Sequence, residues 1–108
     1  MTKTTNYNCR SYVQQCQPFV ASHLRGEWSN GRYMVFSYGQ HWPLFVYEQI
    51  TNTWYGNRNK YSPTTSRHYN QAHPLVDMVM LSVEDMKAVV RGGSVALIEA
   101  ANERMETV

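Results

Sequence analysis

The spacing of apolar residues near the start of the chain predicts an amphipathic helix. From Cys9 as far as Leu24, apolar side chains recur every three or four positions with polar residues between them. Pro18 falls inside this pattern, where it lacks a backbone N–H and clashes with the preceding turn. We therefore expect the helix to break near Gln17 and a second short helix to start at Pro18. The polar residues 1–7 are expected to form a disordered tail.

The middle of the chain carries the turn signals and aromatic runs of antiparallel strands. Asn30-Gly31 favours positive φ at both central positions of a type I′ turn, so we expect it to join strands at 25–28 and 32–38. Two more chain reversals are expected, at 39–42 and 51–53. The result is a meander of short strands rich in aromatic and β-branched residues.

Residues 56–74 show no hydrophobic period and consist largely of turn formers and hydroxyl residues. This composition predicts a long loop. Loops of this length inside a compact domain are uncommon and are more often functional than simple connections.

The last third of the chain predicts a strand followed by helices. The apolar run from Leu75 to Leu81 fits a buried strand, although a helical turn fits it too. Ser82, with acids in the next turn, predicts the start of a helix that ends at Gly92-Gly93. Ser94 can cap a last helix over 95–105.

These elements together predict one α+β domain over residues 1–108. We expect a small antiparallel β-meander of three or four strands with an N-terminal helix and one or two C-terminal helices. The length fits a single domain, and a hydrophobic fraction of 43% provides a core without metal or disulfide staples. No window approaches 18 consecutive apolar residues, and the start lacks the apolar run of a secretory signal. A cytoplasmic protein with no membrane partner is therefore expected.

The two cysteines agree with a reducing compartment. Cys9 and Cys16 are seven positions apart, which on a helix separates them by about 10 Å, too far for a disulfide. We expect both thiols to be small buried hydrophobes.

The formal net charge of +2 conceals an asymmetry along the chain. Residues 1–76 carry seven Lys and Arg against only Glu27 and Glu48, a balance of +5. Residues 77–108 carry three cations against six acids, a balance of −3. Such polarity favours an anionic partner on one side of the molecule, although an ordinary solvated surface also produces it.

The sequence contains no recognisable catalytic or metal-binding pattern. Its four histidines have no zinc spacing with cysteines or carboxylates, and phosphate-binding and nucleophile motifs are absent. Between Gln49 and Val76 there is no Asp or Glu to orient a catalytic histidine. We expect no cofactor and no metal, and a non-enzymatic protein. The alternative is a small metal-independent nuclease or hydrolase that uses His41 and His68.

The acid-free stretch interleaves cations, hydroxyls and tyrosines. Single-stranded or flexible nucleic acid is bound by such mixtures, because cations contact phosphates and rings stack on bases, at about 1–3 kcal/mol per base. The alternative is a structured loop whose hydroxyls satisfy local backbone groups while its tyrosines pack on the sheet. The candidate binding residues are His41, Arg58, Lys60, Tyr61, Ser62, Thr64, Thr65, Ser66, Arg67, His68 and Tyr69.

Two strings in this region occur in a fixed order: Y-G-x-H-x-P at 38–43 and Y-S-x-T-T-S-x-H at 61–68. With them, the chain resembles a family of small proteins encoded by phages, prophages and plasmids, over about residues 19–74. The resemblance implies a mobile-element origin and no particular activity. It implies an accessory protein in the cytoplasm of a bacterial host, for example an inhibitor of a host defence nuclease such as an anti-CRISPR.

The expected function is therefore non-enzymatic binding to a host or phage macromolecule. Nucleic acid or a nucleoprotein complex is the preferred partner, and a host protein is the other possibility. Acidic mimicry of nucleic acid is disfavoured by the balance of +5 over residues 1–76.

Overall fold

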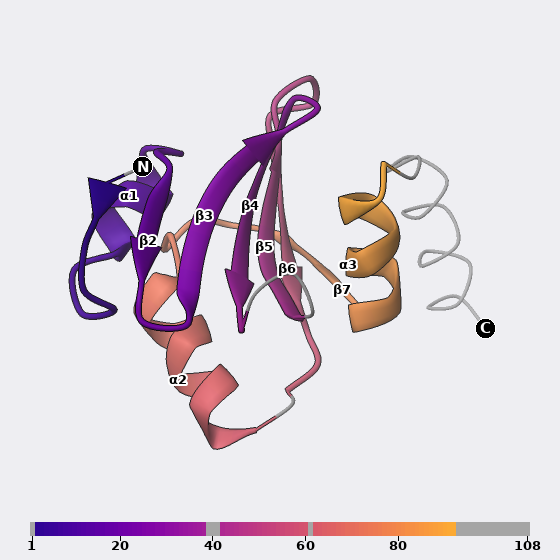
Figure 1. The fold of residues 1–108 in the computed structure, drawn as a ribbon. Coiled ribbons are helices and arrows are strands. Elements are labelled where there is room, and N and C mark those ends of the chain that lie inside the picture. Colours follow the sequence, from indigo (N-terminus) through magenta and orange to yellow (C-terminus); the bar gives the residue numbers. More distant parts are fainter. Residues whose placement is uncertain (1, 39–41, 61, 93–108) are drawn as a thin grey trace.

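The computed structural model describes residues 2–38, 42–60 and 62–92, which fold around one seven-stranded sheet (Figure 1). The strands lie side by side in the order of the sequence. They are β1 (Thr2–Lys3), β2 (Phe19–Ala21), β3 (Leu24–Ser29), β4 (Arg32–Ser37), β5 (Trp42–Glu48), β6 (Thr53–Asn57) and β7 (Val79–Leu81).

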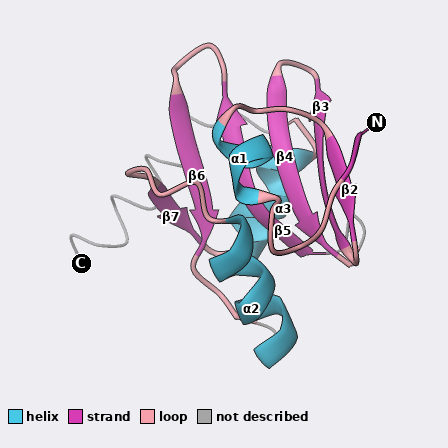
Figure 2. Cartoon of the chain, turned by 90° about the vertical axis from the view of Figure 1, so that its left-hand side faces the viewer, coloured by secondary structure: helices cyan, strands magenta, loops and turns pink. Residues whose placement is uncertain are grey.

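Helices cover both faces of this sheet. The outer pairs β1–β2 and β6–β7 are parallel, and the pairs between them are antiparallel. Each parallel connection contains a helix, α1 (Arg10–Gln14) or α2 (Pro63–Ala72), and both lie on one face, while α3 (Val83–Val90) lies on the other (Figures 1 and 2). Among the described residues, no helix is long and apolar enough to cross a membrane.

The sheet agrees with the predicted α+β class but not with the predicted architecture. An antiparallel meander of three or four strands is wrong, because the sheet is mixed and has seven strands. The additional strands β1, β2 and β7 are each only two or three residues long. Their pairing depends on partners elsewhere in the chain, which a local pattern does not reveal.

The N-terminal helix is shorter than predicted. It ends at Gln14, Cys16 adopts a positive φ of 52°, and the expected second helix at Pro18 is replaced by β2. Phe19 is buried and Val20 is exposed, so this segment alternates as a strand does. Cys16 therefore does not share a helix with Cys9, and both thiols are free. The segment expected to be a polar tail contains β1.

The predicted loop over 56–74 is also wrong, because most of it is the helix α2. The hydroxyl of Ser62 accepts a hydrogen bond from the backbone N–H of Thr65, and the hydroxyl of Thr65 accepts one from the backbone N–H of Ser62. Pro63 follows at the first helical position. The face that α2 buries includes Thr65 and His68, so the helical period is present but largely polar.

Other local signals were interpreted correctly. Asn30 (φ 52°) and Gly31 (φ 77°) join β3 to β4, with Ser29 opposite Arg32. The side chain of Ser82 caps α3, as predicted. The strand expected from Leu75 to Leu81 is reduced to β7, and Leu75 itself is exposed. The predicted helix over 95–105 lies outside the described residues.

The central strand β4 separates two hydrophobic cores. Tyr33 and Val35 point into the core beneath α1 and α2, whereas Met34 and Phe36 point into the core beneath α3. Both faces of β4 are buried, which accounts for its nearly continuous apolar sequence. One core thus holds α2 against the sheet, and the other holds α3 against the opposite face.

Candidate nucleic-acid interface

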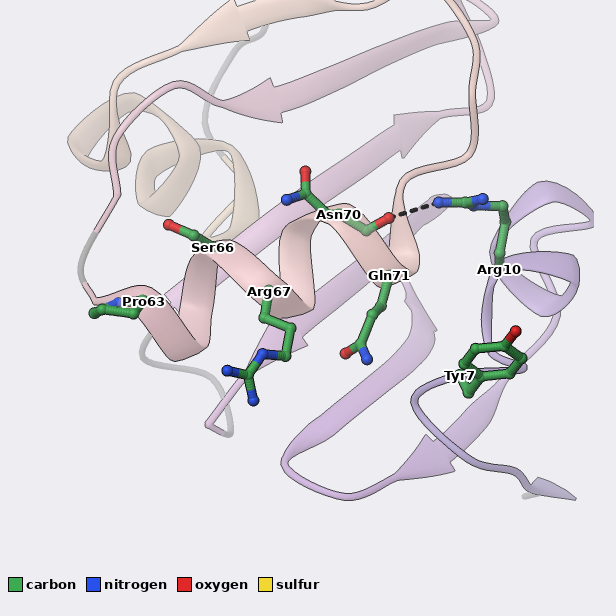
Figure 3. A pocket seen from close by; sticks show the side chains of 7 residues that line it. All are labelled: Tyr7, Arg10, Pro63, Ser66, Arg67, Asn70 and Gln71. Carbon is green, nitrogen blue, oxygen red and sulfur yellow. Dashed lines mark hydrogen bonds between the residues drawn. The ribbon is translucent and has the colours of Figure 1, made fainter.

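The outward face of α2 forms one wall of an open groove with a volume of about 820 Å³ (Figure 3). The residues that α2 contributes are spaced three or four apart, so they share one side of the helix. The segment around α1 closes the groove at the C-terminal end of α2. The lining residues are Tyr7, Arg10, Pro63, Ser66, Arg67, Asn70 and Gln71.

Arg10 brings the two parts of the groove together. Its Nε donates to the carbonyl oxygen of His73 at 2.9 Å, and its Nη2 donates to that of Asn70 at 2.6 Å. These carbonyls lie at the C-terminal end of α2, where backbone acceptors lack helical partners and positive charge is favourable. Gln14 adds a bond from its side-chain amide to the carbonyl of Pro74, at 3.2 Å. The contacts hold residues about sixty positions apart in the sequence as one surface.

The opposite side of α2 is anchored to the sheet by a buried polar pair. Ser37 Oγ lies 2.7 Å from His68 Nδ1, and neither side chain is more than 4% exposed. Burial, then the nearby His23 and Arg67, lower the pKa of His68, so its ring is neutral at pH 7.

Residues of the two sequence motifs, at 38–43 and 61–68, lie close together beside the Ser37–His68 pair. The ring of Tyr38 stacks on His23 at 5.0 Å between centroids and tilts against His68 at 5.6 Å. His23 itself is an exposed turn residue with a positive φ of 56°. One part of the first string and the end of the second therefore lie together beneath α2.

Four of the candidate binding residues have structural partners. Ser62 and Thr65 cap α2 through each other, and His68 is bonded to Ser37. Tyr69 is half-buried, with its ring 4.7 Å from that of Phe45, and burial raises the pKa of its hydroxyl. These side chains position the helix.

The remaining described candidates face outward. Arg58, Lys60 and Arg67 are exposed, and Thr64 and Ser66 are partly exposed. Ser66 and Arg67 line the groove, whereas Arg58 and Lys60 lie in the segment that leads into α2. His41 and Tyr61 lie outside the described residues.

The two acids of residues 1–76 form ion pairs with arginines of the sheet. Glu27 pairs with Arg25 at 3.1 Å, and Glu48 pairs with Arg32, whose Nη1 also donates to the carbonyl of Val89. No other acid occurs before Asp77. Within the part of the chain that the structure describes, Lys3, Arg10, Arg58, Lys60 and Arg67 form no ion pair.

Sequence reasoning missed Tyr7, Arg10, Asn70 and Gln71. Asn70 and Gln71 follow Arg67 at helical spacing, so a correct interpretation of the cap at Ser62 would have placed them beside it. Nothing local connects Tyr7 or Arg10 to α2, because their proximity depends on the packing of α1.

No family model matches the chain, and neither a curated protein nor a solved structure shows significant similarity to it. Within the described ranges, no three His, Cys, Asp or Glu side chains are grouped so as to hold a metal ion. The groove beside α2 is consequently the feature on which a functional proposal rests.

Proposed function

We propose that this protein binds single-stranded or flexible nucleic acid along the outward face of α2. The observation that carries the proposal is the groove itself, which combines two arginines, an exposed tyrosine and two side-chain amides. None of the described residues that line it is acidic. Cations supply contacts to phosphates, and aromatic and amide groups supply contacts to bases.

The positions of the cations suit an extended strand. Arg10 lies at the C-terminal end of α2 and Arg67 at its middle, and Lys60 and Arg58 precede its N-terminal end. A helix of ten residues is about 15 Å long, so this row follows a strand over several phosphates. The cap at Ser62 and the proline at 63 use or remove most N–H groups at the N-terminus of α2, so the arginine and lysine side chains carry the phosphate contacts.

Binding fits the described geometry better than cleavage. His68, a member of the proposed nuclease pair, is 4% exposed and its Nδ1 is bonded to Ser37. A buried ring that holds a helix against the sheet has no path to a scissile phosphate in the groove. In the cell, the proposed role is that of an accessory protein of a mobile element. The protein would bind nucleic acid or a nucleoprotein complex of the host's defence.

The test is a comparison of single-stranded and duplex DNA of one sequence at low salt. Tyr7 is 87% exposed, and its ring can stack only on an unpaired base, so we expect tighter binding of the single strand. Tyr7→Ala should reduce this preference, and Tyr7→Phe, which keeps the ring, should retain it. A folded chain that binds neither DNA nor RNA at low salt, or that prefers the duplex, would refute the proposal.

A further inference from the structure

A series of three aromatic rings runs from beneath α2 to the surface beside it. His68 is 4% exposed, and the ring of Tyr38, a residue 44% exposed, tilts against it at 5.6 Å between centroids. His23 continues the series, because its ring stacks on Tyr38 at 5.0 Å with 27° between the two planes. The His23 side chain is exposed, and among the described residues its ring contacts no ring besides Tyr38. The series is therefore buried at one end and open at the other.

The backbone that carries the two outer rings is strained. His23 has a φ of 56° and Tyr38 a φ of 58°, and the N–H of Tyr38 donates to the carbonyl oxygen of His23 at 2.9 Å. The left-handed region is uncommon for residues other than glycine, and a bulky side chain makes it an outlier. Strained residues of this kind are concentrated at sites that hold a ligand, where the surrounding structure fixes them. The exposed ring of His23 is thus held in place by both a backbone hydrogen bond and a ring contact.

The open end of the series lies beside the groove. The turn between β2 and β3, which carries His23, lies next to α2 (Figures 1 and 2). After burial, His23 and Arg67 are the groups that lower the pKa of His68, so both lie near its ring. Arg67 also lines the groove, is exposed, and forms no ion pair with any residue that the structure describes. A cation near an exposed ring suits a nucleotide, since the cation contacts a phosphate and the ring stacks on a base.

We infer that the exposed ring of His23 stacks on a base of the bound single strand while Arg67 contacts an adjoining phosphate. The base adds a further ring to the series that starts at His68. His23 is not among the residues that line the groove, so the bound strand extends past Arg67 to the turn between β2 and β3. This inference rests on the nucleic-acid binding proposed above and adds a second stacking residue to Tyr7.

The experiment compares two labelled single strands of about 12 units at low salt. One is oligothymidylate, and the other has the same length but lacks every base, so it keeps the phosphates and offers nothing to stack on. His23→Asn removes the ring and keeps a residue that readily adopts positive φ. It should weaken oligothymidylate binding about five-fold or more and leave binding of the abasic strand unchanged. His23→Tyr, which keeps a ring, and Ser22→Ala, in the same exposed turn, should retain the wild-type affinity for oligothymidylate.

Two results would overturn the role of His23 while leaving nucleic-acid binding intact. One is a folded His23→Asn variant that binds oligothymidylate as tightly as the wild type does. The other is an equal loss of affinity for both strands, since a residue that only supports the structure affects them alike. Binding of neither strand by the wild type would refute the proposed function and this inference with it.

A second measurement uses the wild type alone and is decisive even if a substitution disturbs folding. Oligothymidylate with 5-iododeoxyuridine at every position is irradiated in the complex, and the cross-linked peptides are identified by mass spectrometry. A base stacked on His23 should give a cross-link at that residue. Cross-links confined to other residues would overturn the inference.

Discussion

At the scale of single residues, the hydrogen bond between Ser37 and His68 joins the middle of α2 to β4 away from water. Removing the hydroxyl leaves a buried ring nitrogen without its partner. We expect Ser37→Ala to lower the free energy of unfolding by about 1–3 kcal/mol. Ser29→Ala, at an exposed end of β3, should change it by less than about 0.5 kcal/mol in the same urea titration. Equal effects of the two substitutions would show that the bond contributes nothing.

The same pair predicts a dependence of stability on pH. The pKa of His68 is lowered in the folded protein, so the unfolded chain takes up its proton first, near pH 6.5. The stabilisation is complete above that pH and is lost as the pH falls from there through the lower folded pKa. His73, whose pKa is also lowered by burial and by Arg10, acts in the same direction.

The variant His68→Gln keeps a hydrogen-bonding group but cannot titrate. Its free energy of unfolding should therefore decline less than that of the wild type between pH 7 and about pH 5.5, a range in which exposed Asp and Glu are still largely ionised. Denaturant unfolding at a series of pH values measures this difference. Identical pH profiles for the two proteins would contradict the role given to His68.

At the scale of elements, the start of α2 depends on a cap of polar residues, which the spacing of apolar residues does not reveal. Ser62 and Thr65 satisfy each other's backbone N–H groups at the start of the helix. Ser62→Ala should cost about 1 kcal/mol of stability. Ser66→Ala, four residues later on the outward side of the same helix, should cost less than about 0.5 kcal/mol. If Ser66→Ala proved as costly as Ser62→Ala, the cap would not be what fixes the start of α2.

The turn between β3 and β4 rests on backbone conformation alone. Gly31 has a φ of +77°, and a Cβ built on it meets no atom within 4 Å. Gly31→Val should therefore cost about 1–2 kcal/mol through the left-handed conformation and not through a clash. Gly31→Asn should cost less, since asparagine adopts this region more readily. Thermal unfolding that ranks the two variants in the opposite order would contradict this explanation.

The elements that the sequence predicted correctly are those whose signals are local. Asn30-Gly31 and Ser82 each specify a turn or a cap within a few residues. By contrast, β2 forms because Phe19 pairs opposite Gly26, where no side chain interferes with the ring. Arg67 was identified as a candidate from the absence of nearby acids. Arg10 could not be, because its place in the groove depends on α1 packing against the end of α2.

At the scale of the whole molecule, the arginines of the groove and the first acids of α3 lie on opposite faces of the sheet (Figure 1). The face covered by α1 and α2 carries Arg10 and Arg67, while α3 on the other face begins with Glu84 and Asp85. Glu27 and Glu48 are held in ion pairs with arginines of the sheet. Under the proposed function, an anionic partner would be attracted to the side of the molecule that contains the groove.

The salt dependence of single-strand binding tests this account most directly. For the wild type, the logarithm of the association constant should fall linearly with the logarithm of the salt concentration, by about 0.7 per phosphate contact. Replacing Arg58, Lys60 and Arg67 together by alanine should reduce the steepness of that slope by about 2, since three contacts are lost. Arg91→Ala, at an exposed position that follows α3, should leave the slope unchanged. A folded triple variant with the same slope as the wild type would contradict the claim that α2 and the segment before it bind nucleic acid.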